Sequence, residues 1–207
     1  MNPRETSRVY GVKSINRFNF FALYRLIKKS KLFINGGGSL LQDITSTRSL
    51  LYYLGTIRLA LKLGKKVMIY ANGIGPINKK KNEKLVRDVV NQVNLVTLRE
   101  EESFKEIKRL KIDKPPVLVT ADPALTLTPV NETRVKEILN AEKINTDKQL
   151  VCISIRGWKK QSRYSDIIAK TADYIKETYD AEILFIPMHF PRDTWVINSI
   201  ADRMKSR

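Results

Sequence analysis

The chain has 207 residues, of which 43% are hydrophobic and 29% charged, and its formal net charge is +17. This length suits one large domain or two small ones, because single cores stop growing near about 250 to 300 residues. We expect a soluble protein of a reducing cytoplasm. No stretch approaches the roughly 18 apolar residues of a membrane span, the N-terminus lacks the apolar segment of a signal peptide, and the lone Cys152 excludes an intramolecular disulfide.

The first segment of the chain is strongly basic. Residues 1–35 carry eight Lys/Arg and one acidic residue, a net charge of +7. An anionic polymer such as nucleic acid, or an anionic membrane with a lipid-linked substrate, would each explain this excess. A solvated basic surface without a partner is the third possibility. No zinc-finger spacing or aromatic RNA-binding motif is present, so no nucleic acid is expected, and membrane contact and a solvated basic surface stay open.

Helical and strand-like apolar patterns alternate along the next part of the chain. Helices are expected over 19–29, 50–64, 81–93 and 100–110, and strands over 31–34, 67–70, 95–98 and 117–120. Strands that alternate with helices of this length indicate βαβ units and a parallel sheet. The predicted fold class is therefore α/β.

A second βα series follows a looser region, with a domain boundary between Leu125 and Gln149. After a helix over 131–141, the expected order is strand 150–155, helix 164–179, strand 182–186 and helix 194–205. The predicted domains are 1–127 and 150–207, joined by a linker and helix over 128–149. Two strands are too few for a covered parallel sheet. The second domain is therefore expected to be incomplete, unless it joins the first sheet or a partner chain.

The loops after the strands are the candidate sites, because ligands of such sheets bind beyond the carboxyl ends of the strands. The glycine-rich loop at 36–39 has neither the Gly-x-Gly-x-x-Gly spacing nor a following Gly-Lys-Ser/Thr. The sequence therefore gives only weak support for a dinucleotide-binding site or a P-loop. Asp43 is expected near the start of the next helix, where it would repel phosphate but accept hydrogen bonds from sugar hydroxyls. A sugar is the favoured ligand, and a tight turn without a ligand is the alternative.

The loop after the last strand contains His189, the only histidine, between Pro187 and Pro191. Its ordinary pKa near about 6.5 would let it pass a proton at cytoplasmic pH. A structural role in the loop is the alternative. Asp193 is the expected N-cap of the following helix.

Cationic side chains also lie in the loops of the second series. The guanidinium groups of Arg156 and Arg192 suit a carboxylate or phosphate, and Lys159 would add positive charge. Cys152 lies inside an apolar strand, so burial is expected rather than nucleophilic chemistry. No metal or other cofactor is implied, because Cys and His are too few for a zinc site and the carboxylates do not cluster.

Six short motifs occur in one order that resembles the polysaccharide pyruvyl transferases, most closely the CsaB type that modifies secondary cell-wall polymers. They are Gly-Gly-Gly-Ser-Leu-Leu-Gln-Asp at 36–43, Tyr-Tyr-Leu-Gly at 52–55, Gly-Ile-Gly-Pro at 73–76, Thr-Leu-Arg-Glu at 97–100, Thr-Ala-Asp-Pro-Ala-Leu at 120–125 and Pro-Met-His at 187–189. The resemblance covers nearly the whole chain.

The resemblance implies a GT-B-like architecture, with two Rossmann-like domains facing across a cleft. It also implies transfer of the enolpyruvyl carbons of phosphoenolpyruvate to two hydroxyls of a sugar, which gives a cyclic ketal and releases phosphate. The implied acceptor is a sugar of a lipid-linked cell-wall polymer precursor, whose diphosphate anchor would suit the basic N-terminal segment. Phosphoenolpyruvate is the donor substrate, and no cofactor is needed.

The resemblance also distributes roles among the candidate residues. His189 is implied as the catalytic proton carrier, and the donor would bind to Arg156, Arg192 and Lys159. The acceptor would bind to Gly36, Gly37, Gly38, Ser39, Asp43, Asn72 and Asp122. Family members usually carry Gln where Asn72 stands, a change that keeps the amide.

The chain also departs from the family pattern. Relatives usually have a further strand and glycine loop before the equivalent of Asn2, and an Arg-Leu-His motif near their end that helps to bind phosphoenolpyruvate. Neither is found here, so this chain alone is expected to have little or no activity. Two other functions stay open: a GT-B glycosyltransferase that uses a nucleotide sugar, and a non-catalytic module that binds anionic polymer or membrane.

Overall fold

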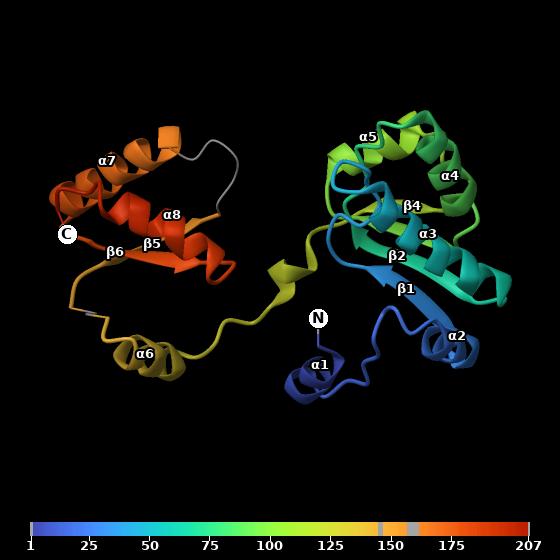
Figure 1. Cartoon of the computed structure of the whole chain (residues 1–207), viewed down its shortest axis with the longest axis horizontal. Coiled ribbons are helices and arrows are strands. Elements are labelled where there is room, and N and C mark those ends of the chain that lie inside the picture. Colours follow the sequence, from blue (N-terminus) through green and yellow to red (C-terminus); the bar gives the residue numbers. More distant parts are fainter. Residues whose placement is uncertain (1, 145–146, 157–161, 207) are drawn as a thin grey trace. The chain divides into compact units, whose positions relative to one another are not determined.

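The computed structural model describes residues 2–144, 147–156 and 162–206. The chain divides after Thr128 into two compact units, each with its own parallel sheet (Figure 1). Both units have the predicted α/β, Rossmann-like character, consistent with a GT-B-like architecture. No helix in the described part of the chain is long and apolar enough to cross a membrane.

The first unit is built on a sheet of four parallel strands in the order β1-β2-β3-β4. The strands are β1 (Leu32–Gly36), β2 (Lys66–Asn72), β3 (Leu95–Leu98) and β4 (Val117–Val119). The crossover helices are α3 (Thr47–Lys62), α4 (Lys80–Val90) and α5 (Glu101–Arg109). Because every connection contains a helix, the carboxyl ends of all these strands meet at one edge of the sheet.

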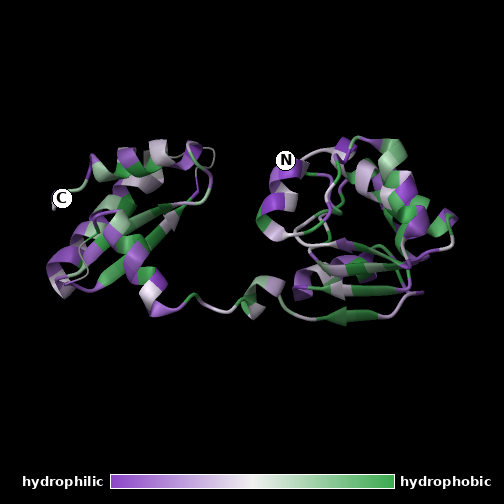
Figure 2. Ribbon diagram, turned by 90° about the horizontal axis from the view of Figure 1, so that it is seen from below, coloured by the Kyte–Doolittle hydropathy of each residue, from purple (hydrophilic) through white to green (hydrophobic). Residues whose placement is uncertain are grey.

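The core of the first unit lies on one face of this sheet. Val67 and Ile69 of β2 and Leu54 of α3 are almost completely buried there. Side chains alternate along a strand, so Ile34 and Tyr70 point to the opposite face, where they are 54% and 43% exposed. Figure 2 shows hydrophobic and hydrophilic residues alternating along the helices, as expected for helices with one buried face.

Two helices precede the sheet. In α2 (Phe20–Lys29), the Asn19 side chain accepts a hydrogen bond from the amide of Ala22, and Ile27 joins the core. The first helix, α1 (Pro3–Tyr10), was not predicted. Its sequence has no apolar stripe of the kind that predicts a helix, and accordingly none of its residues is buried.

The second unit contains a parallel pair of strands, β5 (Leu150–Ile155) and β6 (Glu182–Pro187). Helices α7 (Ser162–Tyr179) and α8 (Arg192–Ala201) pack together, and Val196 and Ile200 of α8 form a small core with Ala169 of α7. A further helix, α6 (Glu132–Ala141), precedes β5, and the short 3-10 helix η1 (Pro123–Thr126) ends the first unit.

Most of the predicted elements are confirmed, but three details were wrong. Helix α8 ends at Ala201, before the predicted residue 205, and α3 begins at Thr47. Cys152 is exposed, not buried. Ile155 packs against the helices, and Cys152 lies an odd number of residues away, so the alternation of the strand turns it to the other face.

Candidate active site

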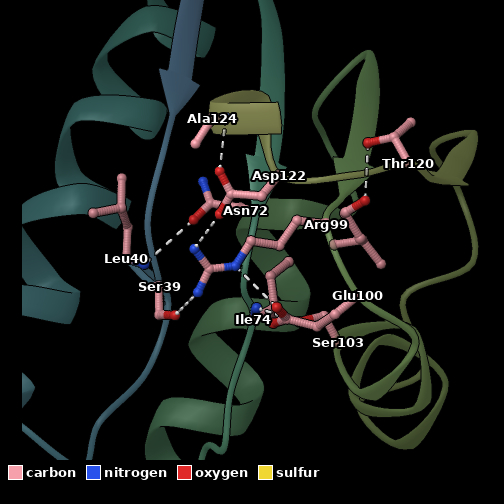
Figure 3. Close-up of polar contacts among 11 residues, drawn as sticks. Ser39, Leu40, Asn72, Ile74, Arg99, Glu100, Ser103, Thr120, Asp122 and Ala124 are labelled. Atoms are coloured by element: carbon pink, nitrogen blue, oxygen red, sulfur yellow. Dashed lines mark hydrogen bonds and ion pairs between the residues drawn. The ribbon is translucent and has the colours of Figure 1, made fainter. Parts of the chain in front are cut away.

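Polar side chains from four separate loops meet where the strands of the first unit end (Figure 3). Ser39 follows β1, Asn72 ends β2, Arg99 follows β3, and Asp122 follows β4. These residues are far apart in sequence and converge because the strands are parallel and adjacent. The predicted residues Ser39 and Asp122 are thereby joined through Arg99.

Arg99 is the centre of this cluster (Figure 3). Its Nε donates to Glu100 Oε2 at 2.9 Å, one terminal nitrogen donates to Asp122 Oδ2 at 3.1 Å, and the other donates to Ser39 Oγ at 3.0 Å. The hydrogen bond to Glu100 is the main reason that the pKa of Arg99 is raised; partial burial opposes the rise, and the charges of Glu100 and Asp122 add to it. The planar guanidinium thus holds three loops in fixed positions.

The cluster around Arg99 carries a net negative charge. Its one cation faces the carboxylates of Glu100 and Asp122, which leaves a formal charge of about −1. The side chains are 26%, 38% and 45% exposed for Arg99, Glu100 and Asp122, so a ligand can reach them. Carboxylate and hydroxyl groups of this kind hydrogen-bond the hydroxyls of a sugar and disfavour a phosphate.

Asn72 supports the glycine loop from within the protein. Its side chain is completely buried; Nδ2 donates to the backbone oxygen of Asn35 at 3.1 Å, and Oδ1 accepts from the Leu40 amide at 3.3 Å. Because both ends of the amide are engaged, Asn72 fixes the path of the loop and leaves ligand contact to exposed neighbours. The Gln that is usual in relatives could make similar bonds.

The glycine loop offers backbone donors beside the Arg99 cluster. Gly37 and Gly38 have φ values of +78° and +71°, a conformation that glycine adopts at no steric cost. Gly37 donates to the Tyr70 carbonyl, and the Gly38 carbonyl accepts from Gly73. Within the described residues, the amides of Gly38 and Ser39 make no hydrogen bond. Both residues are exposed, so their N–H groups are candidates for binding a ligand.

The glycine loop does not lead directly into a helix. Leu41 is fully buried and forms an isolated bridge with Ile74, so the chain first runs beside the loop after β2. Helix α3 starts only at Thr47, and the Ser46 side chain caps it by accepting from Arg48. No helix N-terminus therefore follows the glycines directly.

Asp43 comes shortly before α3 in the sequence, but its side chain bonds to the start of α4. The residue is buried, with 7% of its surface exposed. It accepts hydrogen bonds from the amides of Asn78 and Lys79, at 2.9 and 3.0 Å, and from Asn82 Nδ2 at 2.8 Å. Burial by itself raises the pKa of Asp43, but these hydrogen bonds outweigh it and the pKa falls below its ordinary value. The geometry gives Asp43 a structural role in joining two loops.

The loop after β2 is closely packed against the same cluster. A Cβ added at Gly73 would lie 2.7 Å from Ser39 Oγ and 2.8 Å from Glu100 Oε1, so these side chains would have to shift to accommodate it. The Ile74 amide donates to Ser103 Oγ at 2.8 Å, and that hydroxyl donates to Glu100 Oε1 at 2.8 Å. Glu100 is therefore shared between the loops after β2 and β3.

The second unit places its predicted residues at the carboxyl ends of β5 and β6. Ile155 pairs with Pro187, so Arg156 and His189 follow neighbouring strand ends, and both are exposed. Arg192 is exposed in the first turn of α8. Lys159 lies outside the described residues.

The backbone around His189 is held by Asp193. The His189 amide donates to Asp193 Oδ2 at 2.7 Å, and the Asp193 amide donates to the His189 carbonyl at 3.0 Å. Asp193 was predicted to precede the helix as its N-cap, but it lies in the first turn of α8, after Pro191 at the cap position. With Pro191 as the cap, the helix begins at Arg192, two residues earlier than expected. The Asp193 carboxylate still accepts a hydrogen bond from a backbone amide near the helix start, that of His189.

Two central residues were missed in the sequence analysis, Arg99 and Glu100. Their motif, Thr-Leu-Arg-Glu at 97–100, was noticed only as part of the family resemblance. The signal was nevertheless present, because a charged pair directly after the buried strand β3 stands at the ligand-binding edge of a parallel sheet.

A model of the family described as polysaccharide pyruvyl transferase matches residues 1–205. This region includes all the strand-end residues described above. No match to the sequence was found among curated proteins.

Proposed function

This chain belongs to the polysaccharide pyruvyl transferase family, and we propose that it transfers pyruvate from phosphoenolpyruvate to two hydroxyls of a sugar in a cell-wall polymer precursor. The observation that carries this proposal is the contrast in charge between the two strand-end sites. The cluster in the first unit is net acidic, whereas Arg156 and Arg192 bring positive charge to the corresponding edge of the second unit. A neutral sugar suits the former, and a small trianion suits the latter.

On the acceptor side, we assign sugar contacts to Ser39, Glu100 and Asp122, together with the exposed amide groups of the glycine loop. Arg99 orients these side chains, since it is hydrogen-bonded to all three. Asn72 and Asp43 position the loops from buried sites and are not assigned sugar contacts. Gly36, Gly37 and Gly38 allow the backbone to approach the sugar closely.

On the donor side, we assign the carboxylate and phosphate of phosphoenolpyruvate to Arg156 and Arg192, with Lys159 as a further cation. The reaction adds a proton to the methylene carbon of the donor, while a sugar hydroxyl forms a bond to its C2. The bond between C2 and the phosphate oxygen breaks, and a second hydroxyl of the same sugar closes the ketal ring. The two sugar hydroxyls release two protons. One balances the proton that the methylene carbon gains, and the other leaves with the phosphate. His189, exposed at the strand end, is the proposed proton carrier.

The cellular setting is also a proposal. The CsaB type acts on secondary cell-wall polymers, so we propose a lipid-linked acceptor and a cytoplasmic chain that contacts the inner face of the membrane. The support is the basic N-terminal segment, with a net charge of +7 over residues 1–35. No cofactor is proposed.

Ligand-induced shifts in melting temperature test the identity of the donor. Phosphoenolpyruvate should stabilise the chain, by about 2.7 kcal/mol at about 100 times its dissociation constant. A nucleotide sugar should have no effect at the same concentration, and inorganic phosphate controls for general anion binding. Stabilisation by the nucleotide sugar alone would contradict the proposal and support a glycosyltransferase.

A further inference from the structure

The outward side of α2 carries an unusual combination of exposed residues. Ile27 turns towards the core and is only 4% exposed. On the opposite side, helical spacing brings together Phe21, Arg25, Leu26 and Lys29, which we call the outer face of α2. Phe21 is 84% exposed and Leu26 is 46% exposed, so large apolar side chains alternate with cations on this face.

A hollow of ≈ 390 Å³ lies along this face. It is lined by Ile15, Asn19 and the outer face of α2. The hollow therefore has apolar walls from Ile15, Phe21 and Leu26 and two cations, Arg25 and Lys29. Such a site can accept a group that is anionic at one end and apolar at the other.

The N-terminal sequence around this face repeats the same combination. Tyr10, Phe18 and Phe20 are 73%, 62% and 65% exposed. The guanidinium of Arg17 lies 4.8 Å from the centre of the Phe18 ring, a cation–π arrangement. Residues 1–35 contain eight Lys/Arg and one acidic residue, so these aromatic groups lie in a strongly basic segment.

We propose that the outer face of α2 docks on the surface of an anionic phospholipid bilayer. Arg25 and Lys29 bind lipid phosphates, while Phe21 and Leu26 enter the boundary between headgroups and acyl chains. Helices that lie in a membrane interface combine basic residues with Phe and Leu in this way. Single-stranded nucleic acid could bind the cations and stack a base on Phe21, but it offers no apolar environment for Leu26, so a lipid surface explains more of the face.

This inference deepens the membrane contact proposed above, and its test does not depend on pyruvate transfer. Plain phospholipid vesicles contain neither the sugar acceptor nor phosphoenolpyruvate. A failure to bind vesicles would therefore leave the assignment of the donor and acceptor sites unchanged, and a failed donor assay would leave the lipid surface unchanged.

Flotation with vesicles of phosphatidylcholine, with and without phosphatidylglycerol, tests the proposal on the full chain. We expect binding only to the vesicles that contain phosphatidylglycerol. Phe21→Ser with Leu26→Ser should weaken this binding at least tenfold, and so should Arg25→Glu with Lys29→Glu. The matched controls are Val135→Ser with Ile138→Ser, which are exposed on α6, and Lys80→Glu with Lys81→Glu, which are exposed on α4; these should change binding less than threefold.

A second measurement does not rely on disruptive variants. In Phe21→Trp, the added tryptophan fluorescence should shift to the blue with anionic vesicles and be quenched by brominated lipid, relative to the unchanged chain. An absence of both effects would overturn the proposal. The proposal would also be overturned if the Phe21 and Leu26 variant still bound lipid and single-stranded RNA bound as tightly as lipid. The face would then be a general site for polyanions. Loss of a wild-type dimer in the Phe21 and Leu26 variant, without lipid binding, would make the face a contact between copies.

Discussion

At the scale of single residues, the strand-end site depends on side chains that connect loops as well as on those that face solvent. Arg99 joins three loops through its guanidinium, and a lysine could not reproduce that planar fork. Asp43 also connects two loops, from a buried position where its carboxylate accepts hydrogen bonds from the backbone amides of Asn78 and Lys79. The same residue types that suggested ligand contacts in the sequence also serve the loops themselves.

The pKa of Asp43 gives a prediction about stability and pH. Its folded pKa is lowered, so the stabilisation is complete above the unfolded value of about 3.9 and is lost as the pH falls through the folded value. Asp43→Asn should therefore lower the free energy of unfolding by about 1 to 3 kcal/mol at neutral pH. The difference from the wild type should shrink as the pH falls below about 3.9.

Urea unfolding followed by far-ultraviolet circular dichroism checks this prediction, because both tryptophans, at 158 and 195, lie in the second unit. Asp88→Asn is the control, since that carboxylate is 45% exposed and lies 3.8 Å from its Arg87 partner. It should change stability by no more than about 0.5 kcal/mol. An Asp43→Asn variant as stable as the control variant would show that the buried hydrogen bonds contribute nothing.

At the scale of elements, the periodic helices and strands could be predicted, but the path of the loops could not. The apolar residues of α3 and β2 repeat with the spacing of their elements, which fixes their buried faces. The stretch from Gly36 to Thr47 has no such period. Its path depends on the bridge between Leu41 and Ile74, a contact between segments far apart in sequence, so the partners of Asp43 could not be predicted.

The site was predictable only in part for the same reason. Ser39 and Asp122 stand out as polar residues directly after strands, and the topology alone brings their loops to one edge. The hydrogen bonds of Arg99 with both residues require the actual side-chain geometry. A sequence also cannot distinguish a buried amide such as Asn72 from an exposed one.

The close approach of two loops predicts opposite effects for alanine at two glycines. A Cβ at Gly73 would collide with Ser39 Oγ and Glu100 Oε1 and disturb their bonds to Arg99 and Ser103. We expect Gly73→Ala to cost about 1 to 3 kcal/mol. Gly55 lies within α3 with nothing near the added atom, so Gly55→Ala should stabilise by about 0.5 to 1 kcal/mol. Thermal unfolding of both variants measures these effects. An unchanged stability of the Gly73→Ala variant would contradict this account.

At the scale of the whole molecule, the family match spans both units, and the two strand-end sites differ in charge. In the proposed reaction Arg156 binds a small trianion, while the first unit presents carboxylates around Arg99. Each unit therefore contributes one chemical specificity to the proposed transfer. This division also explains why one parallel-sheet design can serve both substrates, since the function lies in the loops and not in the fold.

Calorimetric titration of phosphoenolpyruvate into the full chain tests this assignment most directly, with Arg156→Gln as the variant and Arg134→Gln as the control. Arg134 is 61% exposed on α6 and pairs with Glu137. The account predicts saturable binding of one donor molecule per chain, weakened about 10- to 150-fold by Arg156→Gln, the effect of losing a charge-assisted hydrogen bond, and unchanged in Arg134→Gln. No saturable binding by the unchanged chain, or equal binding by the Arg156→Gln variant, would contradict it.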